Sequence, residues 1–210
     1  MILTLVISGL IAYLLGSIPT AVWVGKAFYN VDVRTEGSRN AGATNTFRVL
    51  GKKPGIIVLA IDSLKGVTAV VIPIFIFNLE PESTEYANIK VLTGILAVVG
   101  HIFPIFAQFN GGKGVATSLG VVIGINPVAA SICITLFLFV FIVSQFVSLG
   151  AIVASISFPI TVILILKEEN VSMIVFSIVL SIAVILAHKK NIIRLLAGNE
   201  NKMNLFGKKS

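Results

Sequence analysis

Long apolar stretches alternate with short polar segments along this chain of 210 residues. A helix of about 20 apolar residues crosses the hydrocarbon core of a bilayer, so such stretches predict transmembrane helices. The pattern predicts an all-α integral membrane protein with about seven transmembrane helices, some of them short or broken. The stretches cover residues 2–24, 55–79, 91–107, 115–125, 127–147, 149–166 and 171–187.

The amino-acid composition agrees with this prediction. Hydrophobic residues make up 56% of the chain and charged residues only 12%, whereas about 25% of the residues in soluble proteins are charged. The stretch 2–24 is longer than a signal-peptide core and lacks a positive N-terminal region, so we expect a spanning helix. No internal repeat or soluble domain is visible, and residues 1–210 are expected to form a single transmembrane domain.

The fourth stretch, 115–125, is too short for an ordinary crossing. At helical rise it covers about 16 Å, roughly half of the hydrocarbon core. Proline disfavours helix in the residue before it, so Asn126-Pro127 is expected to end this helix. Residues 115–147 then form either a short and a longer crossing or a re-entrant pair, and both return the chain to the same side.

The charges are distributed unevenly between the polar segments. Loop 25–54 has six Lys or Arg against two acidic residues, and segment 188–210 has six against one. Loop 80–90 has three Glu against one Lys, and the connection 167–170 is weakly acidic. Because cytoplasmic loops are enriched in Lys and Arg, we predict a cytoplasmic C-terminus and an N-terminus outside.

A glycine-rich turn, Gly111-Gly112-Lys113-Gly114, precedes the short fourth stretch. Glycine has no Cβ atom, so such a turn can bring its N–H groups close to a small anion. The positive end of a helix starting at Val115 would face the same anion. The turn therefore indicates a phosphate site, with a plain interhelical turn as the alternative. Its spacing fits neither the nucleotide P-loop nor the dinucleotide fingerprint.

The loop between the first two stretches contains the dense polar segment GSRNAGATNTFRVLGKK, which starts at Gly37. A solvated basic loop would explain its charge. Such a loop seldom alternates asparagine, glycine and alanine so densely, so we predict a ligand-binding role. The polar candidates are Ser38, Arg39, Asn40, Thr44, Asn45, Thr46 and Arg48.

Two charged residues lie inside the second apolar stretch. Asp62 and Lys65 share one helical face, at depths of about 12 and 16 Å counted from Pro54. Ionisable groups at this depth indicate a functional site, and an ion pair that fixes helix packing explains them equally well. His101 is expected to be a packed histidine near the break at Pro104, with a substrate contact as the alternative.

Further polar residues come before the sixth stretch and after the last one. Ser148 follows a short turn, where a lone serine usually caps a helix. His188 and Asn191 lie three residues apart on one helical face, and Arg194 and Glu200 follow. A basic anchor for anionic lipid explains the neighbouring lysines but neither the histidine nor the asparagine.

Four blocks, GSRNAGATN, DSLKG, GHIFPIFAQFNGGKGVAT and HKKNIIRLLAGNE, stand in this order in the chain. Together they resemble the bacterial membrane glycerol-3-phosphate acyltransferases that use acyl phosphate as donor, and the resemblance extends from Gly16 to Lys202. It implies a seven-helix bundle in the bacterial cell (inner) membrane that acylates the sn-1 hydroxyl of glycerol 3-phosphate at its cytoplasmic side. Lysophosphatidic acid and inorganic phosphate would be the products. The expected partners are these substrates, the lipid bilayer and the enzyme that makes acyl phosphate, and no nucleic acid.

The resemblance and the residue patterns together predict the members of the site. Catalytic roles fall on His188, Asn191 and Ser148. Substrate-binding roles fall on Ser38, Arg39, Asn40, Asn45, Arg48, Lys65, Gly111, Gly112, Lys113, Gly114, Thr117, Arg194 and Glu200. One departure is visible: the family often has a basic residue and a tyrosine before the serine, where this chain has Gln145 and Phe146.

The expected chemistry needs no nucleophile from the protein. No histidine is followed five residues later by aspartate, and Cys133, the single cysteine, lies away from both histidines. Phosphate is a good leaving group, so we expect direct attack by the substrate hydroxyl, helped by proximity, orientation and cationic charge. The general base is either His188 or the substrate phosphate itself. We predict neither a metal site nor a cofactor.

A membrane transporter or channel for an organic phosphate anion is the alternative function. A transporter needs charged residues that can be reached from both sides, and it often has a repeated half. Here the polar blocks all lie on one predicted side, which favours the enzyme.

Overall fold

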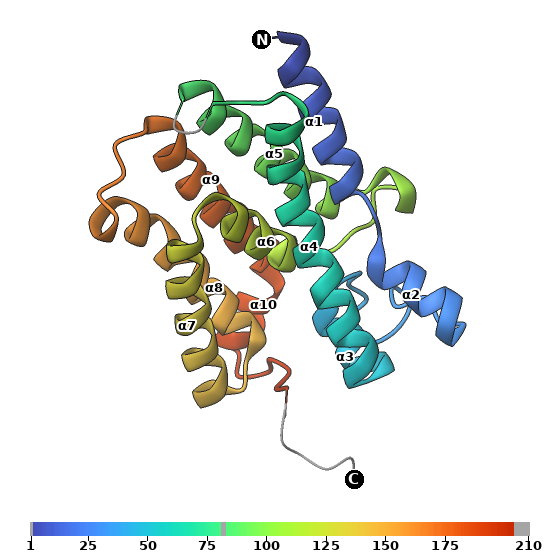
Figure 1. Cartoon of the computed structure of the whole chain (residues 1–210). Helices are drawn as coiled ribbons and strands as arrows, with labels where there is room; N and C mark the ends of the chain where they lie inside the picture. The colour runs from blue at the N-terminus through green and yellow to red at the C-terminus, as the bar shows by residue number, and fades with distance from the viewer. Residues whose placement is uncertain (1, 81–82, 204–210) are drawn as a thin grey trace.

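The computed structural model describes residues 2–80 and 83–203, which form a bundle of helices (Figure 1). All regular elements of these residues are helical, so the predicted all-α class is confirmed. The α-helices are α1 (Ile2–Gly16), α2 (Thr20–Tyr29), α3 (Ala43–Leu50), α4 (Lys52–Ile76), α5 (Thr84–Ile102), α6 (Val115–Ile125), α7 (Pro127–Ser144), α8 (Val147–Ile160), α9 (Val171–Ala187) and α10 (Lys189–Leu196). The 3-10 helix η1 (Ile105–Ala107) follows α5, and the π-helical segment η2 (Thr161–Ile165) follows α8.

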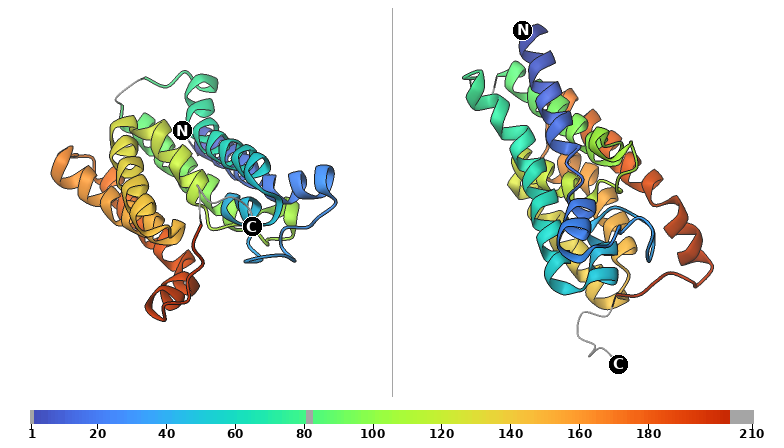
Figure 2. Two further views of the ribbon diagram at one scale, coloured as in Figure 1. Left: turned by 90° about the horizontal axis from the view of Figure 1, so that it is seen from below. Right: turned by 90° about the vertical axis from the view of Figure 1, so that its right-hand side faces the viewer.

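The helices form two groups with α6 between them. In Figure 1, α1, α4 and α5 lie together on one side and α7, α8 and α9 on the other. The view from below in Figure 2 shows the same separation. Buried side chains such as Ala69, Val121, Phe158 and Phe176 form one hydrophobic cluster that extends from α4 through α6 to α8 and α9. The core therefore joins both groups.

Several helices are long and apolar enough to cross a membrane. In the described part of the chain, five segments qualify, and α9 with α10 adds a sixth when this bent pair is counted as one span. Helix α6 has 11 residues and is apolar but short. The multi-pass membrane class is thus confirmed, while the number of crossings and the positions of the termini stay predictions. The five segments are 2–29, 52–76, 84–107, 127–144 and 147–165.

The first apolar stretch qualifies as a membrane span, as predicted, and a break divides it into two helices. Helix α1 ends at Gly16 and α2 begins at Thr20, directly after Pro19. Proline has no N–H group and disfavours helix in the preceding residue, here Ile18. The Ile18 carbonyl accepts a hydrogen bond of 2.8 Å from Lys65 Nζ, so a buried lysine satisfies the backbone at this break.

The predicted break at Asn126-Pro127 is confirmed. Helix α6 ends at Ile125, and the Asn126 side chain accepts a hydrogen bond of 3.0 Å from the Ala129 N–H, which caps α7. Helix α7 turns back from the end of α6, and the two helices pack against each other (Figure 1). The short helix is therefore a separate element that starts at the glycine-rich turn.

Helices α4 and α6 approach each other backbone to backbone. A Cβ atom on Gly120 would overlap the Ser63 carbonyl, and one on Gly66 would overlap the Thr117 carbonyl. Small residues permit this close approach in membrane proteins, where van der Waals packing drives helix association. The contact places Ser63, and with it the neighbouring Asp62 of α4, against the middle of α6.

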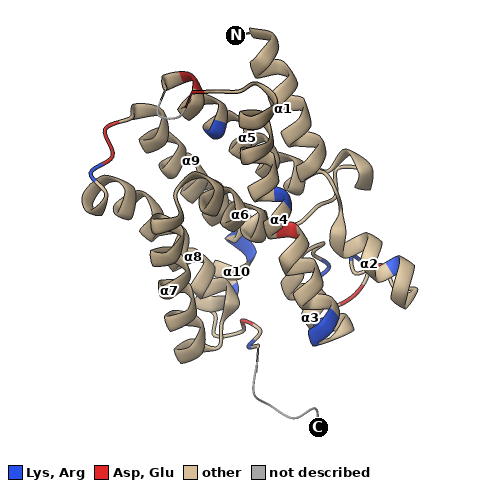
Figure 3. Ribbon diagram, viewed as in Figure 1, with Lys and Arg blue, Asp and Glu red and all other residues tan. Residues whose placement is uncertain are grey.

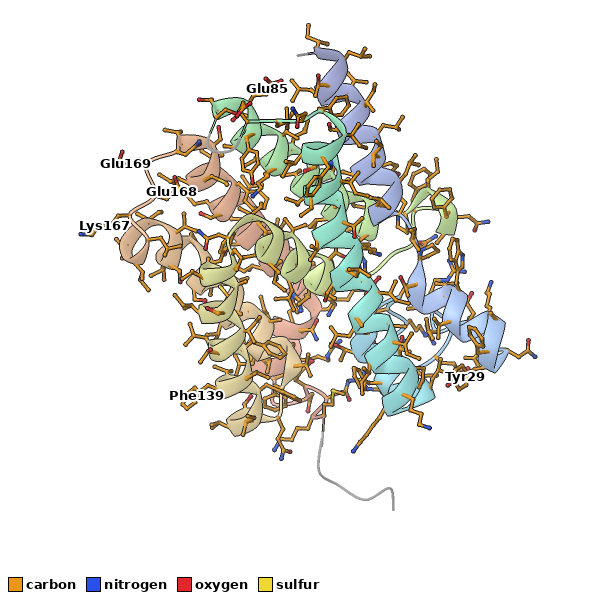
Figure 4. The ribbon with its side chains drawn as sticks, viewed as in Figure 1. Tyr29, Glu85, Phe139, Lys167, Glu168 and Glu169 are labelled. Carbon is orange, nitrogen blue, oxygen red and sulfur yellow. The ribbon has the colours of Figure 1, made fainter. Side chains whose placement is uncertain are left out.

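Charged residues are rare along the middle of the bundle and gather at its ends. Figure 3 shows most of the Lys and Arg in the half that contains α2, α3 and α10. Figure 4 places Glu85 at the opposite end, near the start of α1, with Lys167, Glu168 and Glu169 on the connection before α9. This distribution agrees with the predicted orientation.

We predict that Lys53 and Lys202 face the cytoplasm and Glu85 the outside. In a Cys133→Ala background, single cysteines at these exposed positions can be probed with an impermeant thiol reagent in right-side-out vesicles. Only the cysteine at 85 should react before the vesicles are opened. Labelling of the cysteine at 53 in sealed vesicles would refute the orientation.

Gly120→Ala should lower the melting temperature in detergent, because the added methyl group forces α6 away from Ser63. Overpacking of this kind costs about 1–3 kcal/mol. The matched control is Gly124→Ala on the same helix, where the nearest atom to a new Cβ is Val70 Cβ at an ordinary 3.4 Å. Equal melting temperatures of the two variants would contradict the close helix contact.

Candidate active site

A cavity of about 530 Å³ lies between the two helix groups. Its polar end is formed by the first polar loop (residues 31–42), α3, the start of α6, α10 and a C-terminal strap (residues 199–203). Its apolar part runs between α6, α7, α8 and α9 and is lined by side chains such as Val122, Ile134, Phe137, Phe158 and Leu180. The cavity can thus hold a molecule with a polar head and an apolar tail.

Lys113, Asn191, Arg194, Ser148 and Glu200 form one network at the polar end. Lys113 Nζ donates to the side-chain oxygen of Asn191, and Asn191 Nδ2 donates to Glu200 Oε1 at 2.7 Å. Ser148 Oγ donates to the same oxygen at 3.0 Å, and Arg194 Nε donates to Glu200 Oε2 at 2.7 Å. The network brings together three segments that are far apart in the sequence, around Lys113, around Ser148 and over 191–200.

Glu200 is the anionic centre of this network. Burial raises the pKa of its carboxyl group, but the hydrogen bonds from Arg194, Asn191 and Ser148 outweigh burial and hold the pKa below its ordinary value. Glu200 therefore stays ionised and orients three polar side chains around the cavity.

The positive charges at this end are crowded. Burial lowers the pKa of Lys113 to about 8, and the neighbouring charges of Arg194 and Arg48 act in the same direction. All three cations line the cavity. An anion between them would relieve this repulsion, so the polar end is suited to phosphate.

His188 lies at the cavity wall, between α9 and α10. Its Nδ1 is 2.8 Å from the Val184 carbonyl oxygen. A carbonyl can only accept a hydrogen bond, so the imidazole hydrogen is on Nδ1 and the lone pair is on Nε2. In this tautomer His188 can accept a proton through Nε2.

Asn45, predicted to bind substrate, holds the first polar loop. Its side-chain oxygen accepts hydrogen bonds from the N–H and the hydroxyl of Ser38 at 2.8 and 3.0 Å. Its amide nitrogen donates to the carbonyl oxygens of Val33 and Glu36 at 2.7 and 3.1 Å. Asn45 is 1% exposed, so its main contribution is to place Ser38 at the cavity.

The glycine loop (Gly111–Gly114) differs in one respect from its sequence-based interpretation. The Gly112 N–H donates to the His101 carbonyl oxygen at 3.1 Å, so it is not free for an anion. Cβ atoms on Gly111 and Gly112 would overlap the His101 backbone and imidazole, respectively. Gly114 has a φ of 79°, which favours glycine. Packing and backbone conformation therefore explain these glycines, and Lys113 remains the loop's contribution to the cavity wall.

The predicted site residues divide into two sets. Six predicted residues do not belong to the cavity lining: Arg39, Lys65, Gly111, Gly112, Gly114 and Thr117. Lys65 instead forms an ion pair with Asp62 at 2.8 Å. The other predicted residues reach the lining: Ser38, Asn40, Asn45, Arg48, Lys113, Ser148, His188, Asn191, Arg194 and Glu200. Within the described ranges, no three His, Cys, Asp or Glu side chains cluster closely enough to hold a metal ion.

Sequence reasoning missed the apolar lining and left Asp62 and His101 out of the predicted site, although both reach the cavity. In the sequence, a leucine or phenylalanine that faces the cavity cannot be distinguished from one that faces lipid, so the apolar lining could not be predicted.

Gln145 and Phe146 hold the strap in place. The Gln145 carbonyl accepts a hydrogen bond from the Met203 N–H at 2.9 Å, and Lys202 Nζ lies 5.6 Å from the Phe146 ring centroid.

Comparison with known proteins gives consistent matches. The family model described as glycerol-3-phosphate acyltransferase matches residues 6–198. A glycerol-3-phosphate acyltransferase of Chlorobium chlorochromatii is 39% identical, over 98% of this chain and 99% of that protein. One of Macrococcus caseolyticus is 43% identical, over 92% of this chain and 94% of that protein.

A solved structure has the same fold. The crystal structure of PlsY (YgiH), an integral membrane glycerol 3-phosphate acyltransferase in its glycerol 3-phosphate form, superimposes with a TM-score of 0.85. It shares 36% sequence identity and covers 97% of this chain and 99% of its own. Its lysophosphatidic acid form gives a TM-score of 0.82.

Glu200→Gln should destabilise the protein by about 1.5–3 kcal/mol at neutral pH, because the charge-assisted hydrogen bond from Arg194 is lost. The folded-state pKa of Glu200 is lowered, so its contribution is present above the unfolded pKa and disappears as pH falls through the folded value. Melting temperatures of the two proteins should therefore converge in acid. Glu85→Gln, at an exposed position, is the control, and an equal loss in both variants would contradict the role of Glu200.

Proposed function

This chain belongs to the glycerol-3-phosphate acyltransferase family, and from this premise we propose that it transfers an acyl group from acyl phosphate to the sn-1 hydroxyl of glycerol 3-phosphate. The products are lysophosphatidic acid and inorganic phosphate. The observation that carries this proposal is the joining of a cationic end and an apolar part in one cavity. The transporter alternative loses its support, because the family is one of acyltransferases.

The cationic end is suited to the phosphate groups of both substrates. Arg48, Lys113 and Arg194 come from three separate segments and line the same end of the cavity. Arginine and lysine form short, charge-assisted hydrogen bonds to phosphate oxygens. Two phosphates with several negative charges would balance three cations, of which only Arg194 forms a salt bridge with a carboxylate of the described chain.

The apolar part of the cavity suits the acyl chain of the donor. Phe137 and Ile134 of α7 face the cavity together with Ala151 and Phe158 of α8. These apolar walls offer the acyl chain surroundings similar to those of the bilayer interior. The chain then holds the reactive carbonyl at the cationic end, where the acceptor phosphate binds.

We derive the reaction as one displacement at the acyl carbonyl. The sn-1 oxygen of glycerol 3-phosphate attacks the carbonyl carbon, and the carbon–oxygen bond to phosphate breaks. The hydroxyl proton passes either to His188 Nε2 or to a phosphate oxygen of the substrate. The arginines stabilise the negative charge that develops on the leaving phosphate, while Lys113 holds the phosphate of the acceptor.

Ser148 and Asn191 support this reaction by position. Ser148 donates its hydrogen to Glu200, so its oxygen can accept a hydrogen bond from the acceptor hydroxyl. Asn191 holds Lys113 through its side-chain oxygen and Glu200 through its nitrogen, which fixes the ammonium group in the cavity.

The proposed location is the bacterial inner membrane, with the polar end of the cavity at the cytoplasmic side. Positive loops frame this end, as the positive-inside rule requires. Glycerol 3-phosphate would enter from the cytoplasm, and contact with the enzyme that makes acyl phosphate would deliver the donor.

Acyl phosphate should be a far better donor than acyl-coenzyme A. The site offers cations for a phosphate leaving group, and in the described part of the chain no serine or cysteine is hydrogen-bonded to a histidine that could activate it toward a thioester. Purified protein with glycerol 3-phosphate and each donor in turn, followed by quantification of lysophosphatidic acid, tests this. Comparable turnover with both donors would refute the proposed donor specificity.

Lys113→Ala should raise the KM for glycerol 3-phosphate. Loss of a charge-assisted hydrogen bond costs about 1.5–3 kcal/mol, or roughly 10- to 150-fold. The pKa of Lys113 is about 8, so the cation is present below this pH, and kcat/KM should fall as pH rises through it. Lys113→Arg, which stays charged, should lose this alkaline decline. An unchanged KM for glycerol 3-phosphate with a raised KM for the donor would move Lys113 to the donor phosphate.

A further inference from the structure

A buried charged cluster, formed by Thr20, Asp62, Lys65 and His101, lies beneath the glycine loop. Asp62 Oδ1 accepts a hydrogen bond of 2.9 Å from Thr20 Oγ1 and pairs with Lys65 Nζ at 2.8 Å. His101 Nδ1 lies 3.8 Å from the same carboxylate oxygen. These four residues are between 1% and 6% exposed, so the cluster is buried, with Asp62 and His101 at the cavity wall.

Helix packing alone does not account for this cluster. A buried ion pair contributes little net stability compared with apolar residues of the same volume, because both charges lose their hydration. Asp62 Oδ2 and His101 Nδ1 also have no hydrogen-bond partner among the described residues. Buried polar groups without partners are rare and call for an explanation.

The cluster touches the glycine loop through His101. The His101 carbonyl oxygen accepts from the Gly112 N–H at 3.1 Å, and its imidazole lies directly against the Gly112 Cα, where a Cβ atom would overlap Nε2. The same Cβ position is 2.9 Å from the Ala41 carbonyl oxygen of the first polar loop. Gly112 is therefore held between His101 and Ala41, so both loops of the polar end meet at this point.

The residue after Gly112 is Lys113, whose ammonium group lines the cationic end of the cavity. Any tilt of the His101 ring would move the backbone of Gly112, and with it Lys113 and the first turn of α6. Asp62 directly precedes Ser63, which lies against Gly120 of α6. It also lies beside the imidazole, so it can restrict the ring.

We propose that Asp62 and His101 are positioning residues for the phosphate site. Asp62, held by Lys65 and Thr20, fixes the orientation of the His101 ring, and the ring fixes Gly112 and hence the position of Lys113. The expected change in KM rests on the proposed function. The expected change in loop mobility rests on the loop geometry alone. Neither residue contacts the reacting atoms in this scheme.

The test is a set of variants measured with full-length protein in detergent. His101→Ala removes the ring. Asp62→Asn with Lys65→Met neutralises the ion pair as a unit, which avoids leaving one charge buried and unpaired. The triple variant combines both changes. Thr93→Val is the control for loss of a buried polar group in α5, because among the described residues the Thr93 hydroxyl donates only to carbonyl oxygens of its own helix.

In His101→Ala, KM for glycerol 3-phosphate should rise about 10- to 100-fold, the range expected when a site is misplaced by about 1 Å. KM for acyl phosphate should change much less. The Asp62/Lys65 variant should shift in the same direction, and the triple variant should be no worse than His101→Ala, because the carboxylate acts through the ring. Additive effects, or equal rises in both KM values, would overturn the proposal.

Hydrogen–deuterium exchange at residues 110–114 gives a readout that does not need activity. Exchange should be faster in His101→Ala and in the Asp62/Lys65 variant, and unchanged in Thr93→Val. Unchanged exchange in all variants would overturn the positioning role. If the wild-type protein forms no lysophosphatidic acid, the proposed function fails, while the exchange experiment still decides whether the cluster holds the loop.

Discussion

Concentrated positive charge at the end of an apolar bundle is the constraint on which the rest of this structure depends. Arg48, Lys113 and Arg194 line one end of a cavity whose other walls are mostly hydrocarbon. In such surroundings charges stay stable only when they are held and compensated. Glu200 and Asn191 hold two of the cations, and the geometry leaves room for anions to complete the balance. Substrate binding is in this sense the last step of assembling the site.

Much of the fold was predictable because membrane helices must be apolar. The seven stretches, the break at Asn126-Pro127 and the polar blocks around Ser38, Lys113 and Asn191 follow from residue type and spacing. The break at Pro19 was missed because the residues on both sides are as apolar as a spanning helix. The hydropathy of a segment indicates whether it lies in the membrane, but it does not indicate whether the segment forms one continuous helix.

The site was predicted less completely, because a residue type does not reveal its contact partner. The missing Cβ atom of Gly112 was interpreted as space for an anion, whereas in the structure the His101 ring occupies that space. Lys65 had two interpretations, a substrate contact and an ion pair with Asp62; its ammonium group forms the ion pair and also donates to the Ile18 carbonyl. Asn45 was expected to bind substrate, and its side-chain amide forms hydrogen bonds with the first polar loop. In each case the sequence located a functional region, and the partner came from packing between distant segments.

The short length of α6 has a consequence for where the reaction takes place. Helix α6 begins at the glycine loop and has only 11 residues, and its partner α7 turns back immediately toward the same end. In the proposed orientation, the site therefore lies at the boundary between water and the bilayer. A water-soluble acceptor and a lipid-like donor can meet there while each remains in the medium in which it dissolves. The product, with a charged head and one acyl chain, is already oriented as a membrane lipid when it forms.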